Sequence, residues 1–273
     1  MKFMHNTPLV SIITVCFNSE KFIKKTIESV LNQTYSNIEY IIVDGSSSDS
    51  TLNIIKEYEP LFNGRMRWIS EKDNGIYDAM NKGIKMANGE LIGIINSDDW
   101  YSQNAVEILV SEYNKSPDIG VFYGNMYLVD KDGKIVLFAK PTSDLTNYSC
   151  YDWMPFGHPT AFVRKTVYDS IGAFNTKYKI AADHEFVMRC SSKSIKFKYI
   201  DEIIANFREG GACDNHNEGL RESTLIKIDY GAIAGKAWRM YKIAVLKANL
   251  FKLGKRIKIL LYIYEFYRKN GKR

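Results

Sequence analysis

The sequence predicts an α/β fold in which a mixed, mostly parallel sheet is flanked by helices. Over the first hundred residues, short runs of β-branched and aliphatic residues alternate with amphipathic helical segments. The overall composition, 45% hydrophobic and 25% charged residues, is that of an ordinary globular protein. Strands that alternate with helices pair in parallel, so we expect a Rossmann-like half that binds its ligand at the carboxyl ends of the strands.

The first half of the chain, residues 1–100, is expected to hold four strands and three helices. In the first helix, apolar residues recur at i, i+4, i+7 and i+8 from Ile23, which is the pattern of a helix that packs on a sheet. Asp49 or Ser50 can cap the second helix. The expected strands are 9–16, 39–43, 67–69 and 91–95, and the expected helices begin near 20, at 49–50 and at 76.

The second half, residues 101–235, has the pattern of a mixed or antiparallel arrangement. Asp132-Gly133 separates two apolar runs and predicts a hairpin. Arg208-Glu209-Gly210-Gly211 is expected to be a flexible junction. The other expected elements are a helix over 102–113, strands at 120–123, 127–129 and 134–138, a loop–strand junction at 157–163, a helix ending near 171, a helix opening at 181, and a strand over 203–207.

Two adjacent carboxylates, Asp98 and Asp99, follow the buried strand 91–95. Two acids at one strand end repel each other unless a cation or hydrogen-bond donors compensate them. Mg²⁺ is held by one or two carboxylates together with substrate phosphates, so a metal ion on a diphosphate is one explanation. A solvated turn with capping acids is the other. Asp44 ends the second strand and should lie at the same edge, and this convergence favours a nucleotide site.

The cysteines and the chain start indicate a reducing compartment. Four cysteines, at positions 16, 150, 190 and 213, show neither a metal-ligand spacing nor a disulfide framework. The first residues lead into a strand with no signal-peptide pattern, and no run of 18 apolar residues exists. We therefore expect a cytoplasmic protein without a membrane-spanning helix.

The positive charge is concentrated in residues 236–273. That segment has twelve Lys or Arg residues and one Glu, a net charge of +11, whereas residues 1–235 carry −5. Leucine and isoleucine recur there at three or four residues, which predicts a basic amphipathic helical tail at the inner face of the cell membrane. A helix packed on the domain, a contact between copies in a homo-oligomer, and a nucleic-acid-binding tail are the alternatives. The acidic body argues against nucleic acid.

Four motifs together make the chain similar to a known family. SIITVCFN at 11–18, IIVDGSSSDST after the second strand, NGIYDAMNKGI at 74–84 and NSDDW followed by AADHEF occur in this order. With them the chain resembles the inverting family 2 glycosyltransferases of the bacterial surface-polysaccharide type, which have the GT-A fold. The resemblance runs from residue 11 to about 211. It implies a nucleotide-sugar donor, a UDP-sugar in particular, a Mn²⁺ or Mg²⁺ ion, and direct transfer with inversion to a glycan or lipid-linked acceptor.

The resemblance also implies roles for single residues. Asp44 would accept a hydrogen bond from the base, Asp99 would ligate the metal ion, and Asp98 would contact the ribose or the metal. Asp183 would be the general base, although its position also suits a helix N-cap. Further residues of the donor site would be Thr14, Cys16, Phe17 and Asn18, which follow or end the first strand, and Asn96 in the turn that contains Asp98 and Asp99.

Four other residues are candidates with a structural alternative. Asp73 and Asp78 flank the NGIYDAMN run and would line the donor sugar, but acids are common at helix starts. His158 would meet the acceptor or order its own loop. Arg208 beside two glycines would close over the diphosphate as a lid.

The sequence departs from the family pattern at two acidic positions. Asn96 replaces the first acid of Asp-x-Asp-Asp, and Ala182 replaces the acid before the general base. The processive Gln-x-x-Arg-Trp signature is absent, so we expect transfer of one sugar at a time. Residues 1–235 would be the catalytic domain, with a nucleotide-binding half (1–100) and an acceptor half (101–235), and 236–273 the tail.

Two further functions fit parts of the sequence. A sugar-phosphate nucleotidyltransferase shares the Rossmann-like half, but no Gly-rich basic loop follows the first strand. A donor-binding protein that has lost catalysis is disfavoured because Asp98, Asp99 and Asp183 are all present. The sugar, the nucleotide, the acceptor and the linkage are not specified by these patterns.

Overall fold

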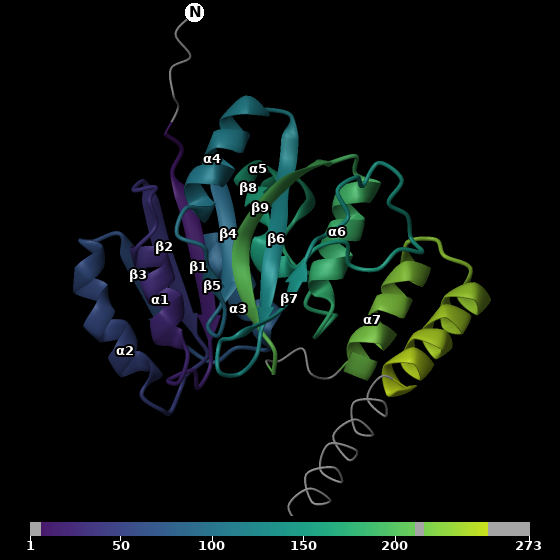
Figure 1. Cartoon of the computed structure of the whole chain (residues 1–273), viewed down its shortest axis with the longest axis horizontal. Coiled ribbons are helices and arrows are strands. Elements are labelled where there is room, and N and C mark those ends of the chain that lie inside the picture. The colour runs from purple at the N-terminus through teal and green to yellow at the C-terminus, as the bar shows by residue number, and fades with distance from the viewer. Residues whose placement is uncertain (1–6, 211–215, 251–273) are drawn as a thin grey trace, which may run out of the picture.

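The computed structural model describes residues 7–210 and 216–250. It has one curved sheet with helices on both faces (Figure 1). The strands are β1 (Val10–Cys16), β2 (Ile38–Asp44), β3 (Met66–Ser70), β4 (Leu91–Asn96), β5 (Trp100–Tyr101), β6 (Ile119–Val129), β7 (Ile135–Ala139), β8 (Phe162–Arg164) and β9 (Lys196–Arg208). The helices are α1 (Ile23–Leu31), α2 (Thr51–Tyr58), α3 (Ile76–Met86), α4 (Ala105–Lys115), α5 (Lys165–Ile171), α6 (Ala182–Ser192) and α7 (His216–Asp229), with short 3₁₀ turns at Glu59–Phe62 and His158–Thr160.

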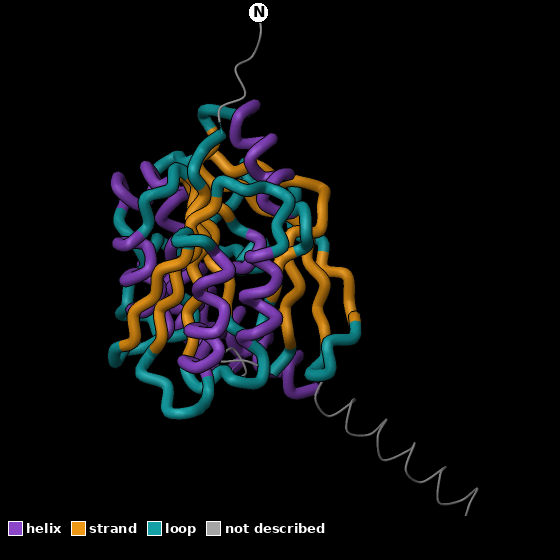
Figure 2. Tube along the Cα trace, turned by 90° about the vertical axis from the view of Figure 1, so that its left-hand side faces the viewer, coloured by secondary structure: helices purple, strands orange, loops and turns teal. Residues whose placement is uncertain are grey.

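The first half is the predicted parallel arrangement. Strands β3, β2, β1 and β4 lie side by side in that order, and every pairing among them is parallel. In Figure 1 the chain enters β1 from the N-terminus at the top, so the carboxyl ends of these strands lie at the lower edge. Figure 2 shows loops (teal) gathered below the strands (orange) at this edge.

The second half is mixed, as predicted. Strand β8 joins β4 and β6 in antiparallel pairings, β9 runs parallel to β6, and the short β5 pairs with the end of β9. The predicted hairpin exists between β6 and β7. The two expected segments 120–123 and 127–129 form one long strand, β6, because β9 pairs along its whole length.

Alternating residues of β1 pack on the two faces of the sheet. Val10, Ile12 and Cys16 join one apolar core with α1, α2 and α4, whereas Ile13 and Val15 join the other with α3, α5, α6 and α7. The strands are buried on both faces, which is why they read as continuous apolar runs.

The start of the basic tail is helical. A helix over 234–250 lies beside α7 (Figure 1), and it exposes large apolar side chains at Ile243, Leu246 and Leu250. The rest of the predicted tail, 251–273, lies outside the described residues. Within the described part of the chain, the helices are too short or too polar to cross a bilayer.

Candidate active site

The carboxyl ends of three neighbouring strands form the floor of an open cleft. Cys16 at the end of β1 lies opposite Asp44 of β2, and Val15 lies opposite Asn96 of β4. The loops beyond these ends enclose about 870 Å³, a volume in the range of small-ligand sites. Six predicted site residues line the cleft, namely Cys16, Phe17, Asn18, Asp73, Asn96 and Asp98.

The three loops around the cleft are tied to one another. The Asn18 side-chain oxygen accepts a hydrogen bond from the Ser48 amide at 2.9 Å, and the Ser47 hydroxyl accepts one from the Asn18 amide at 2.8 Å. Ser19 and Ser97 share a bond between their hydroxyls at 2.8 Å. Asn18 has a positive φ of 49°, a conformation that Asn adopts more readily than most residues. The cleft is therefore preformed.

Asp44 is fully buried beneath the cleft and organises the serine-rich loop. One carboxylate oxygen accepts bonds from the Ser47 hydroxyl (2.5 Å) and the Cys16 thiol (3.6 Å), and the other from the Ser47 amide (2.9 Å) and the Ser70 hydroxyl (2.7 Å). Four bonds fill the acceptor sites of a carboxylate. Asp44 can accept a base N–H only when one of these donors, such as the Ser47 hydroxyl, turns away.

The other predicted residues of the first strand end differ in exposure. Phe17 is 63% exposed at the cleft and offers a flat apolar surface. Burial, and then the neighbouring Asp44 charge, raise the pKa of the Cys16 thiol, so this group stays protonated. Thr14 lies in the sheet core, where its hydroxyl accepts a bond from Tyr40 at 3.0 Å, and it does not line the cleft.

Lys82 on α3 forms ion pairs with acidic residues near the start of that helix. Lys82 pairs with Asp73 at 2.6 Å and with Glu71 at 2.9 Å, and it lies 3.8 Å from Asp78. Burial opposes the change, but these carboxylates raise the pKa of Lys82. Asp73 lines the cleft, whereas Asp78 accepts a bond from the Asn74 amide at 2.9 Å and caps the start of α3.

The turn after β4 leaves one acid half-buried at the cleft and buries the other completely. Asp98 lines the cleft. Asp99 is 1% exposed, and its Oδ1 accepts a bond from the Arg208 amide at 2.8 Å. Burial raises the pKa of Asp98. Burial, and secondly the charge of Asp98, raise the pKa of Asp99 well above its ordinary value. The surrounding protein groups therefore do not fully compensate the negative charge that Asp98 and Asp99 carry when they are ionised.

The side chains of this turn suit a hard divalent cation whose remaining ligands come from a substrate. The buried Oδ2 of Asp99 and Oδ1 of Asn96 have no hydrogen-bond partner within the described residues. Over the same residues, no three His, Cys, Asp or Glu side chains come together as a metal site. Two adjacent carboxylates and an orphaned oxygen fit an ion that takes its other ligands from phosphates and water.

Arg208 lies beside the turn after β4 and does not line the cleft. Its side chain donates to the carbonyl oxygens of Lys131 (2.5 Å), Asp98 (3.3 Å) and Asp130 (3.3 Å), and it stacks 4.5 Å from the Phe22 ring. The residue is 7% exposed and is not part of the cleft lining. In this structure Arg208 joins the turn after β4 to the β6–β7 hairpin, and its guanidinium is bonded to backbone carbonyl oxygens there.

Asp183 lies in a second pocket that adjoins the cleft. This pocket, of about 230 Å³, shares Ile76, Asn96 and Phe207 with the cleft. Oδ1 of Asp183 accepts bonds from the Tyr77 hydroxyl (3.0 Å) and from the following amide of His184 (2.8 Å). Within the described residues both hydrogen bonds to this carboxylate go to Oδ1, which leaves Oδ2 to accept a proton.

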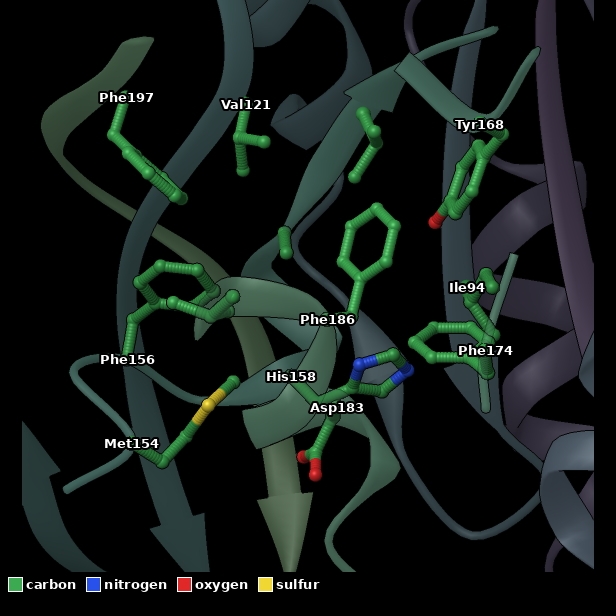
Figure 3. Close-up of a pocket in the computed structure, with 13 residues that line it drawn as sticks. Ile94, Val121, Met154, Phe156, His158, Tyr168, Phe174, Asp183, Phe186 and Phe197 are labelled. Carbon is green, nitrogen blue, oxygen red and sulfur yellow. The ribbon is translucent and has the colours of Figure 1, made fainter. Parts of the chain in front are cut away.

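His158 lies next to Asp183 (Figure 3), and it also lines this second pocket. Its ring meets Phe174 edge-on with centroids 5.8 Å apart, and its Nε2 has no partner within the described residues. Burial lowers the pKa of His158, so the imidazole is neutral at pH 7. The aromatic cavity behind it measures about 20 Å³, which is room for about one water molecule and not for a substrate.

Several residues of this second pocket escaped the sequence analysis. Tyr77 lies inside the NGIYDAMN motif, where only the acids drew attention. Other missed residues include Met80, Met126, Met154, Phe156, Lys179 and Ile180, which come from four separate segments and form a pocket only through the fold.

The sequence matches a family model and curated proteins of related function. The model described as glycosyl transferase family 2 matches residues 11–172. A chondroitin synthase of Escherichia coli is 29% identical over 203 residues, which are 74% of this chain and 29% of that protein. The chain thus spans less than a third of that relative. A PGL/p-HBAD biosynthesis glycosyltransferase of Mycobacterium bovis is 25% identical over 218 residues, 76% of this chain and 80% of the relative.

Solved structures share the fold at low identity. TarS of S. aureus (residues 1–349) in complex with UDP-GlcNAc matches with a TM-score of 0.62 and 19% identity over 84% of this chain and 69% of that one. A mannosyltransferase from Pyrobaculum calidifontis, in complex with GDP-Man and Mn²⁺, matches with a TM-score of 0.61 and 16% identity over 82% and 65% of the two chains. The predicted fold, a mostly parallel sheet flanked by helices, is confirmed.

Proposed function

The chain belongs to glycosyl transferase family 2, and from this premise we propose that it transfers one sugar from a nucleoside-diphosphate sugar to an acceptor hydroxyl, with inversion at the anomeric carbon. The observation that carries the proposal is the junction of two pockets. The cleft above Asp98 and the pocket of Asp183 share Ile76, Asn96 and Phe207. A donor in the cleft would present its sugar to an acceptor in the pocket.

The donor would lie with its nucleoside at the β1 end of the cleft. The exposed ring of Phe17 gives the base a stacking surface. Asp44 would read the base N–H after the Ser47 hydroxyl turns away, and Asp73 would meet the donor sugar. We favour a UDP-sugar, because a neighbour of the same fold was solved with UDP-GlcNAc, although another was solved with GDP-Man.

A Mn²⁺ or Mg²⁺ ion would be held by Asp98 and Asp99. When bound, it would neutralise the negative charge that develops on the departing nucleoside diphosphate. Asp99 would turn its orphaned Oδ2 to this ion while Oδ1 keeps the bond to the Arg208 amide.

Asp183 would act as the general base. The acceptor hydroxyl gives its proton to Oδ2 while its oxygen forms a bond to the anomeric carbon. The bond from that carbon to the phosphate oxygen breaks, and the nucleoside diphosphate leaves with the electron pair. Attack from the face opposite to the leaving group inverts the centre, so no protein nucleophile is needed. Tyr77 orients the carboxylate by donating a hydrogen bond to Oδ1, so Oδ2 can accept the proton.

The acceptor is proposed to be a glycan or a lipid-linked glycan at the inner surface of the cell membrane. The helix 234–250 exposes Ile243, Leu246 and Leu250 among cationic residues, a composition that suits a lipid surface. Leu246→Asp with Leu250→Asp should at least halve flotation with anionic phosphatidylglycerol vesicles. The matched control is Leu61→Asp, at a residue 53% exposed on another part of the surface. Unchanged flotation of the double variant would contradict membrane binding by this helix.

A product assay tests the proposed reaction directly. The protein is incubated with Mn²⁺, a panel of nucleotide sugars and a panel of oligosaccharide acceptors, and the released phosphates are identified. Release of a nucleoside diphosphate together with a glycosylated acceptor supports the proposal. Release of pyrophosphate from a nucleoside triphosphate and a sugar phosphate would instead show a nucleotidyltransferase.

A further inference from the structure

Helix α7 carries polar side chains that are buried, which is unusual for a helix at the edge of a fold. Glu222, Ser223, Thr224 and Lys227 are all at most 9% exposed, and Lys227 is fully buried. Buried charges are rare unless bonded partners hold them. The helix lies outside residues 11–172, the part that matches the family model, so the family match assigns it no role.

Glu222 binds the chain just before the helix that carries Asp183. Its carboxylate accepts three consecutive amide hydrogen bonds, from Lys179 (2.7 Å), Ile180 (2.8 Å) and Ala181 (2.9 Å). These amides precede α6, and Ala181 is the residue at its N-cap. Asp183 is the second residue of α6, so Glu222 fixes the backbone from which the proposed base projects.

Two of the residues that Glu222 holds are themselves part of the second pocket. Lys179 and Ile180 line this pocket together with Asp183. The Tyr77 hydroxyl also lies 2.8 Å from the carbonyl oxygen of Ile180, so its single hydrogen is shared between this oxygen and Oδ1 of Asp183. One wall of the pocket is therefore anchored to α7.

Lys227 binds a segment that leads into a second set of pocket residues. Its ammonium donates to the Tyr151 carbonyl at 3.1 Å and lies 3.2 Å from the centroid of the Trp153 ring. The chain then runs directly into Met154, Phe156 and His158, which line the pocket. Burial lowers the pKa of Lys227 to about 8, so the ammonium still carries its charge at neutral pH.

We propose that α7 positions the acceptor pocket, with Glu222 holding the wall that carries Asp183 and Lys227 holding the wall that carries His158. Glu222 and Lys227 are positioning residues, since neither lines the pocket. That this pocket binds the acceptor rests on the proposed function. The anchoring of its walls by α7 does not depend on that function. The donor cleft is built from the first half of the chain and Phe207 and Gly210, and it does not depend on α7.

Hydrogen–deuterium exchange of the full chain tests the anchoring without any substrate. Glu222→Gln keeps the shape but leaves a single acceptor oxygen, and Glu222→Ala removes both. We expect amide exchange at 177–184 to speed up about tenfold or more in Glu222→Ala and less in Glu222→Gln. We expect Lys227→Met to speed up amide exchange at 149–158. Exchange at the cleft loops, 16–19 and 44–48, should be unchanged.

The control is Glu218→Gln on the same helix, because among the described residues the Glu218 carboxylate pairs with the exposed Arg221 alone, at 2.7 Å. Unchanged exchange at 177–184 in both Glu222 variants would overturn the inference. Equal acceleration at the cleft loops would overturn it too, because that result means general loss of structure. If Glu222→Ala does not fold, the same two criteria apply to Glu222→Gln.

The kinetic consequence separates the inference from the proposed function. In the transfer assay, Glu222→Gln should lower kcat/KM for the acceptor at least tenfold and leave the Kd of UDP with Mn²⁺ within twofold. Equal kcat/KM for variant and wild type would overturn the inference. Failure of the wild type to bind any nucleotide would contradict the proposed function alone, while the exchange result would still decide the anchoring.

Discussion

The hydroxyl of Tyr77 lies 3.0 Å from Oδ1 of Asp183 and joins α3 to α6. Tyr77 belongs to α3, which borders the donor cleft, and Asp183 belongs to α6 in the proposed acceptor half. The two residues are 106 positions apart in the sequence. The proposed base is therefore oriented by a residue of the half that is proposed to bind the donor, and it lies where the two pockets adjoin.

Asp183→Asn is expected to abolish transfer while the donor still binds. Loss of a general base lowers the rate by about 10²–10⁴. The side chain does not line the donor cleft, so the Kd of the nucleotide should stay within twofold. Steady-state kinetics and calorimetry check the two parts, with Asp169→Asn on the exposed side of α5 as a control. A variant that retains more than a tenth of the wild-type kcat would exclude Asp183 as the base.

Tyr77→Phe is expected to lower kcat by about tenfold, since a hydrogen bond to a charged group contributes about 1.5–3 kcal/mol. The ring stays in place to pack on Phe174, with centroids 5.3 Å apart, so the fold should be retained. The nucleotide Kd should not change. An unchanged kcat in a folded variant would show that the bond does not orient Asp183 for reaction.

Arg208→Met is expected to destabilise the fold, because it leaves the carbonyl oxygens of Lys131 and Asp98 without their donor. A loss of about 2–4 kcal/mol is expected from buried groups left unpaired. This corresponds to a fall in Tm of about 5–10 °C. The control is Arg221→Met, at an exposed arginine on α7. A normal Tm combined with weaker nucleotide binding would favour the diphosphate-lid role expected from the sequence.

Asp99→Asn is expected to raise the Tm of the protein without metal or nucleotide. Burial and the Asp98 charge raise the pKa of the Asp99 carboxyl in the folded state, so its ionised form weakens the fold. The neutral amide removes this cost while it keeps an oxygen for the Arg208 amide. A gain of at least about 2 °C is expected at pH 7 in EDTA.

The pH dependence of that gain has a definite sign. Between the ordinary Asp value near 3.8 and the raised pKa, the folded state binds more protons than the unfolded state, so stability falls as pH rises through this window. The difference in Tm between Asp99→Asn and wild type should therefore be small near pH 4 and largest at neutral pH. A gap that does not vary with pH, or a less stable variant at pH 7, would contradict the uncompensated charge.

The regular elements were predictable where the chain keeps a simple period. Strands β1, β2 and β4 are buried on both faces, so their apolar runs are continuous and their bounds were close. Helix α7 was missed because its inward side carries Glu222, Thr224 and Lys227, which break the apolar period. Strand β5 has two residues and is defined only by its pairing with β9.

The location of the site was predictable, but the direction of its side chains was not. Parallel strands bring Asp44 and the Asp98-Asp99 turn to one edge whatever the loops do. Whether a carboxylate faces the cleft depends on a local competition between donors. The Asn74 amide donates a hydrogen bond to the Asp78 carboxylate. The Arg208 amide, 109 positions further along the chain, donates one to Oδ1 of Asp99. No sequence period encodes such bonds.

Calorimetric titration with UDP and GDP, in Mn²⁺ or in EDTA, tests the central claim that Asp98 and Asp99 hold a metal ion on a donor diphosphate. Wild type and Asp98→Asn are compared, with Asp132→Asn on the exposed hairpin as a control. We expect one nucleotide to bind wild type and the control at least tenfold more tightly with Mn²⁺ than with EDTA, and this difference to vanish in Asp98→Asn. Binding that ignores both the metal and the substitution, or no binding by folded wild type, would contradict the account.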